Sequence, residues 1–165
     1  MRKARVRSII FTSLALLALP AGAVEITKGC FERNYSAAHL AKQPAQIVEA
    51  IRLWIYVNDY QETIADMTVQ FGDRGRIRGT ASAGQIMQQS LFCWQDSAAV
   101  GCSVECDGGW FNVTRDTGDV LTFRTEGLVV GDSEGCGGAE SLAEVIGTPV
   151  SYRLTRVEDV YCGGN

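Results

Sequence analysis

The most constraining feature of the sequence is an alternating pattern of apolar and polar residues over residues 91–123, which turn-forming segments interrupt. Asp107 and Gly108 are typical of a two-residue type I′ turn, and residues 116–118 of a three-residue loop with Gly in a left-handed conformation. A third short loop lies at residues 96–99. Because side chains alternate between the two faces of a strand, the pattern predicts consecutive antiparallel hairpins with one shared apolar face.

These turns also predict which residues lie opposite one another. The turn at residues 107–108 places Val104 opposite Phe111, and the next loop places Phe111 opposite Phe123. The loop at residues 96–99 places Cys93 opposite Cys102. All of these residues fall on the apolar face, so the predicted hairpins are mutually consistent.

Four further strands are predicted outside this region. Period-2 alternation indicates strands over residues 47–57 and Thr63–Phe71, and a shorter one from Val150 to Leu154. A three-residue loop at residues 73–75 would pair Phe71 with a strand over residues 77–81. The strand over residues 86–94 then leads into the hairpins described above.

The overall prediction is an all-β fold, an antiparallel eight-stranded meander that closes into a small barrel. A two-sheet β-sandwich is the alternative, because it requires the same alternation. Two short helices accompany the strands, one over Ala37–Lys42 with Ser36 as its N-cap and one over residues 139–146. The inward side chains are mostly bulky, which predicts a packed interior and a partner bound at the outside or the rim.

The N-terminus has the features of a signal peptide over residues 1–23. Residues 1–7 carry four positive charges, residues 9–19 are apolar, and Ala21, Gly22 and Ala23 supply a small-residue cleavage site. An uncleaved membrane anchor is the alternative, but the apolar run is short for a transmembrane helix. We therefore expect a periplasmic or secreted protein, with one domain over residues 24–165 and no integral membrane segment.

The mature chain is acidic. Four of the 15 basic residues lie in the signal peptide, so 11 basic residues face 19 acidic ones and the net charge is −8. Nucleic acids and anionic membranes are bound by extended patches of Lys and Arg, which a chain of this net charge does not provide. The charge therefore excludes nucleic acid as a partner.

All six cysteines follow the signal peptide, which predicts three disulfides in an oxidising compartment. The hairpin register pairs Cys93 with Cys102, and Cys106 is then left for Cys136. Joining Cys30 to Cys162 closes a long loop, an effect worth about 4–5 kcal/mol in chain-entropy estimates. A zinc site is the alternative, but there is no Cys-x-x-Cys and His39 is the only histidine.

Candidate contact residues lie on two outward strand faces. Trp54 and Tyr56 form an aromatic pair, although scattered exposed aromatic residues are ordinary. Arg74, Arg76 and Arg78 form the one basic cluster of the mature chain, either an anion site or a solvated strand face.

The sequence identifies no catalytic, cofactor-binding or metal-ligating residue. His39 lacks a recognisable partner and is interpreted as a packing or surface histidine. Residues 131–138 are glycine-rich and acidic, but their spacing does not fit a calcium loop, so we expect a surface loop.

Two segments carry a resemblance to other proteins. They are the run Cys30-Phe-Glu-Arg with His39, Leu40 and Pro44, and the run Cys102-Ser-Val-Glu-Cys-Asp-Gly-Gly109. Together they resemble small exported proteins of proteobacteria, a resemblance that implies export but no particular activity. The likeness to lipocalin-type barrels is architectural, since the lipocalin Gly-x-Trp signature is missing.

These observations favour a non-catalytic exported binding or interaction protein of the bacterial envelope, whose partner is a protein or a small apolar ligand. One alternative is a small periplasmic hydrolase or redox enzyme that uses His39 or a cysteine. The other is a structural or stress protein of the envelope.

Signal-peptide cleavage is predicted between Ala23 and Val24. Intact-mass measurement of exported protein should give a chain that begins at Val24, because the small side chains before it suit the signal peptidase. Exported material that retained the apolar run would contradict both the cleavage site and the predicted location.

Overall fold

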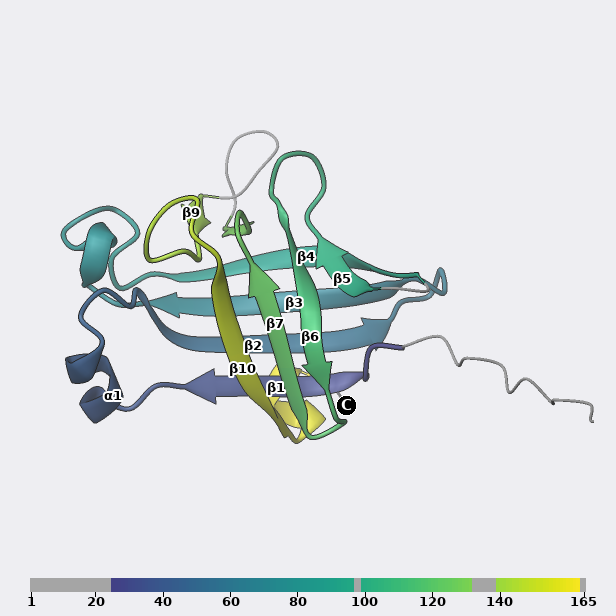
Figure 1. The fold of residues 1–165 in the computed structure, drawn as a ribbon. Helices are drawn as coiled ribbons and strands as arrows, with labels where there is room; N and C mark the ends of the chain where they lie inside the picture. Colours follow the sequence, from purple (N-terminus) through teal and green to yellow (C-terminus); the bar gives the residue numbers. More distant parts are fainter. Residues whose placement is uncertain (1–24, 97–98, 132–138, 164–165) are drawn as a thin grey trace, which may run out of the picture.

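The computed structural model describes residues 25–96, 99–131 and 139–163 (Figure 1). The predicted signal peptide therefore lies outside the described residues, as do residues 132–138, which make up most of the predicted surface loop. No helix within the described ranges is long and apolar enough to cross a membrane.

Eight antiparallel strands form a closed barrel in the order β1-β10-β7-β6-β5-β4-β3-β2. In Figure 1, β6, β7 and β10 run steeply across β1–β4, as strand tilt in a closed barrel requires. The predicted barrel is thus confirmed over the sandwich. The strands are β1 Gly29–Asn34, β2 Val48–Val57, β3 Thr63–Phe71, β4 Ile86–Gln95, β5 Val100–Ser103, β6 Trp110–Asp116, β7 Val120–Thr125 and β10 Val150–Val157.

The strand predicted over residues 77–81 does not form. The chain instead makes the 3-10 helix η1 (Gly75–Ile77) and a series of turns, with positive φ at Gly75 and Gly79. Positive φ is incompatible with an extended strand. As a result β3 pairs directly with β4, with Val69 opposite Met87.

The eighth strand is β1, in a segment where the sequence pattern indicated no strand. Cys30 lies opposite Trp54 of β2 and also opposite Val157 of β10, so β1 joins the two ends of the sheet. Phe31 is fully buried in the core. The predicted number of strands was therefore right, but one of the eight was assigned to the wrong segment.

Two predicted registers are shifted by two residues. Phe111 lies opposite Cys102 instead of Val104, because residues 105–108 form a longer loop in which Cys106 has φ 60°. Similarly, Phe123 lies opposite Val113 instead of Phe111. A shift of two residues leaves each side chain on its predicted face, so the core is unaffected.

Two predicted disulfides lie within the described residues, Cys93–Cys102 and Cys30–Cys162. Cys93 and Cys102 are also directly opposite each other in the β4–β5 ladder, which confirms that register. Cys106 is disulfide-bonded as well, while Cys136, its predicted partner, lies outside the described residues.

Of the two predicted helices, only α1 (Ala37–Lys42) is present, and Ser36 Oγ caps it by accepting from His39 N at 3.2 Å. The helix predicted over residues 139–146 is wrong. Its first part is the strand β9 (Glu140–Ser141), which pairs with β8 (Val129–Val130). Leu142 N donates to Leu128 O, so long-range backbone bonds replace the helical ones.

The barrel interior is filled by bulky side chains. Phe111 and Phe123 pack with ring centroids 4.6 Å apart, and Phe123 packs against Tyr152 at 5.5 Å. The Tyr152 hydroxyl is buried and donates to Leu142 O at 2.8 Å. Burying a hydroxyl requires such a partner. Buried aromatic side chains from β6, β7 and β10 thus occupy the inside of the barrel.

We expect Phe31→Ala to lower the free energy of unfolding by about 3–5 kcal/mol, because it empties a fully buried site in the strand that closes the barrel. The matched control is Phe92→Ala, since Phe92 is 41 % exposed on β4. That change should cost about 1 kcal/mol or less in urea unfolding. Equal losses for the two variants would contradict the central role of β1.

Candidate functional site

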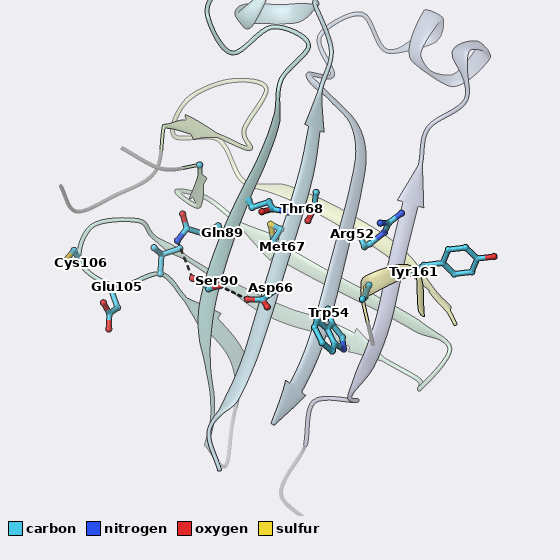
Figure 2. Close-up of a pocket in the computed structure, with 15 residues that line it drawn as sticks. Arg52, Trp54, Asp66, Met67, Thr68, Gln89, Ser90, Glu105, Cys106 and Tyr161 are labelled. Carbon is cyan, nitrogen blue, oxygen red and sulfur yellow. Dashed lines mark hydrogen bonds between the residues drawn. The ribbon is translucent and has the colours of Figure 1, made fainter. Parts of the chain in front are cut away.

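A groove of about 890 Å³ lies on the outer face of β2, β3 and β4 (Figure 2). Alternate residues of these strands, such as Leu53 and Leu91, are buried in the core. Their neighbours therefore face outward and form the floor of this cavity, which we call the outer groove. The floor residues are Arg52, Trp54, Asp66, Thr68, Gln88 and Ser90.

Two segments held by disulfides form the walls of the outer groove. One wall is the 3-10 helix η2 (Asp159–Cys162), which contacts β1 and β2 and is bonded to β1 through Cys30–Cys162. The other wall is residues 104–106, in which Cys106 is disulfide-bonded. The Cys30–Cys162 bond thus holds the η2 wall covalently against the sheet.

The floor contains a hydrogen-bonded network centred on Asp66. The Ser90 hydroxyl donates to Asp66 Oδ1 at 2.5 Å, and the Tyr56 hydroxyl donates to Asp66 Oδ2 at 3.1 Å. Figure 2 shows Trp54, Asp66 and Ser90 side by side. Burial and the Asp66 carboxylate raise the pKa of Tyr56, so its hydroxyl stays a donor at neutral pH. The network fixes the orientation of these side chains.

Arg52 is paired with Glu32 across the β1–β2 ladder. Arg52 Nε donates to Glu32 Oε2 at 2.8 Å, and the two residues are directly opposite each other in register. Opposite charges in such positions attract and orient each other. The guanidinium charge at this edge of the groove is therefore compensated within the protein.

The structure separates the candidate contact residues into two sets. Trp54 and Tyr56 lie together on the outer face of β2, with ring centroids 4.5 Å apart. Trp54 lines the outer groove, and Tyr56 donates a hydrogen bond to Asp66, which also lines the groove. The predicted aromatic pair is thus part of a single polar and aromatic surface.

The three arginines lie outside the outer groove, in the β3–β4 connection. Arg76 forms an ion pair with Glu140 at 2.6 Å and donates to Ser141 O and Ala143 O. Arg74 donates to Leu40 O, within α1. Arg78 is exposed. Two of the three arginines therefore hold neighbouring segments in place through backbone carbonyls.

His39 lies on α1, also away from the outer groove. Its Nε2 is 2.9 Å from Gln46 Oε1, and its ring packs against Tyr35 with centroids 4.9 Å apart. These contacts place His39 in the packing between α1 and the start of β2. Within the described ranges, no group of three or more His, Cys, Asp or Glu residues is placed to hold a metal ion, and no cysteine is free.

Sequence reasoning did not select the polar floor residues Asp66, Thr68, Gln88 and Ser90. Each is an outward residue of a half-buried strand, a position that polar residues ordinarily occupy. What distinguishes them is the register, which places Trp54 opposite Asp66 and Asp66 opposite Ser90. That register was mispredicted for β3 and β4, so the grouping was not visible in advance.

Comparison with protein-family models, curated proteins and solved structures gives no significant match. The resemblance to exported proteins of proteobacteria stays an expectation from the sequence. The chemistry of the outer groove is then the basis for a functional proposal.

We expect Arg76→Ala to lower the free energy of unfolding by about 1–3 kcal/mol, because the arginine makes charged hydrogen bonds and its side chain is only 25 % exposed. Arg78→Ala is the matched control and should change the free energy by about 0.5 kcal/mol or less. Urea unfolding measures both. An equally small effect of both substitutions would mean that Arg76 does not brace the β9 segment.

Proposed function

We propose that this chain is an exported, non-catalytic binding or interaction protein of the bacterial envelope, and that it engages its partner through the outer groove. The observation that carries the proposal is the construction of the groove. Trp54 lies among hydrogen-bonding side chains on a three-stranded floor, between two walls that each contain a disulfide-bonded cysteine. Preformed concave sites with an aromatic side chain and a few oriented polar groups are typical of binding sites.

The packed interior supports an external binding site. Small barrels bind ligands inside when their cores leave space, as lipocalins do. Here Phe31, Phe111, Phe123 and Tyr152 are all buried within the barrel. The filled interior thus supports a partner site on the outer surface, where the outer groove lies.

The disulfides support a location outside the cytoplasm, in the periplasm or in secreted material. Structural disulfides persist in oxidising compartments and are rare in the cytosol. Two disulfides form within the described part of the chain, and the Cys30–Cys162 bond joins residues 132 positions apart in the sequence. This pattern agrees with the signal peptide expected over residues 1–23.

A hydrolase would use a nucleophile activated by a nearby base. Ser90 donates to Asp66, but His39, the one histidine of the sequence, lies on α1 and contacts Gln46 and Tyr35. The arrangement of Asp66 and Ser90 orients groups for hydrogen bonding to a partner. The geometry therefore favours binding over catalysis.

The proposal predicts that binding to the envelope depends on Trp54. Mature protein should co-sediment with isolated bacterial envelopes, and Trp54→Ala should reduce the bound fraction about tenfold, as loss of an interface tryptophan commonly does. Trp110→Ala is the matched control, because Trp110 is 56 % exposed on β6 outside the groove. It should bind like the unchanged protein.

Two results would overturn this proposal. One is equal binding of the unchanged protein and Trp54→Ala with both correctly folded by circular dichroism. The other is loss of binding in Trp110→Ala alone, which would move the contact surface to β5 and β6.

A further inference from the structure

We propose that the outer groove binds an uncharged, unbranched oligosaccharide. This inference rests on the proposed function and names the chemistry of the partner. It follows from three properties of the floor: compensated charge, unused neutral hydrogen-bonding groups, and an aromatic ring set among them.

Charges on the floor are already satisfied by neighbouring residues. The Arg52 guanidinium is bonded to Glu32, and both oxygens of Asp66 accept hydroxyl donors. Glu105, on the wall, adds a further negative charge. A phosphate or an acidic sugar would meet a net negative surface, so electrostatics favours a neutral ligand.

Neutral polar groups on the same floor remain unused. Thr68 and Gln88 lie directly opposite each other on β3 and β4. Within the described part of the chain, neither side chain makes a hydrogen bond. A hydroxyl and a carboxamide together supply donors and acceptors for sugar hydroxyls.

The floor has a regular spacing that suits a linear ligand. One row runs across the strands through Arg52, Thr68 and Gln88, and a second runs through Trp54, Asp66 and Ser90. Since neighbouring strands lie about 4.8 Å apart, each row is about 10 Å long. That length corresponds to two linked pyranose rings, which would lie between the two walls at the ends of the rows.

Trp54 provides the apolar contact that a sugar ring requires. Its ring is half-buried beside Tyr56 at 4.5 Å, so it is held in one orientation. An aromatic face carries partial negative charge and attracts the C–H groups on one face of a pyranose. Hydroxyl groups at the edge of that pyranose then reach the polar residues on either side.

An extended peptide is a weaker fit to this floor. Peptides that add to a sheet bind the unpaired backbone groups of an edge strand. Here β3 is paired with β2 on one side and with β4 on the other. Recognition at the centre of the floor must therefore use side chains, as oligosaccharide binding does.

Isothermal titration calorimetry of the mature protein tests the inference with four hexasaccharides. Cellohexaose, chitohexaose and maltohexaose are neutral, and hexagalacturonic acid is the charged control. At least one neutral ligand should bind with a Kd below about 1 mM, and hexagalacturonic acid should bind at least about tenfold more weakly.

Variants locate the bound ligand. Trp54→Ala should weaken binding of the neutral ligand about tenfold, whereas Trp110→Ala should leave it unchanged. Thr68→Val has nearly the same shape and suits a strand, and it should weaken binding several-fold by removing one hydroxyl. This second variant keeps the test decisive if Trp54→Ala does not fold.

Failure of this inference is distinguishable from failure of the proposed function. If no neutral hexasaccharide binds at up to about 5 mM while envelope binding still depends on Trp54, the groove holds a protein and the oligosaccharide is wrong. Binding of a neutral ligand that Trp54→Ala and Thr68→Val leave unchanged would also overturn it. If the unchanged protein binds neither a neutral hexasaccharide nor bacterial envelopes, the proposed function is wrong as well.

Discussion

Closure of the barrel by β1 is the constraint on which the rest of the structure depends. Without β1, the outer edges of β2 and β10 would present unpaired backbone N–H and C=O groups. Such exposed edges can pair with strands of other chains, which leads to aggregation. β1 pairs with both strands, and Phe31 projects from it into the core. The disulfide from Cys30 to Cys162 then ties this strand to the C-terminal segment. Closure, core packing and cross-linking therefore meet at two consecutive residues, Cys30 and Phe31.

The outer groove is a consequence of that closure. Because Cys162 is bonded to β1, η2 lies against the outer face of β1 and β2 and rises beside Trp54. The bulky aromatic residues fill the inside, and the polar and aromatic residues of the outer groove lie outside. For the proposed binding function, a filled barrel directs recognition to its surface, whereas a barrel with a hollow core would direct it inward.

Structural roles account for residues that drew attention in the sequence for other reasons. Arg76 holds the β9 segment through Glu140 and backbone carbonyls, and His39 packs between α1 and β2. Arginine is suited to this use because its planar guanidinium makes several hydrogen bonds at once. Trp54 and Tyr56 are the predicted contact residues that lie at the groove, where their rings contact each other and Tyr56 donates to Asp66.

The sequence by itself determined the features that depend on neighbours in the chain. The alternation over Thr63–Phe71 predicts β3 with its observed bounds, and Ser36 caps α1 as expected. The pairing of Cys93 with Cys102 follows from one short loop. Only the tertiary structure decided the rest. β1 is a strand because it lies between β2 and β10, and Leu142 leaves the helical pattern because it bonds to Leu128. The outer groove needs three strands in one register beside two cross-linked walls, and such distant contacts leave no local pattern.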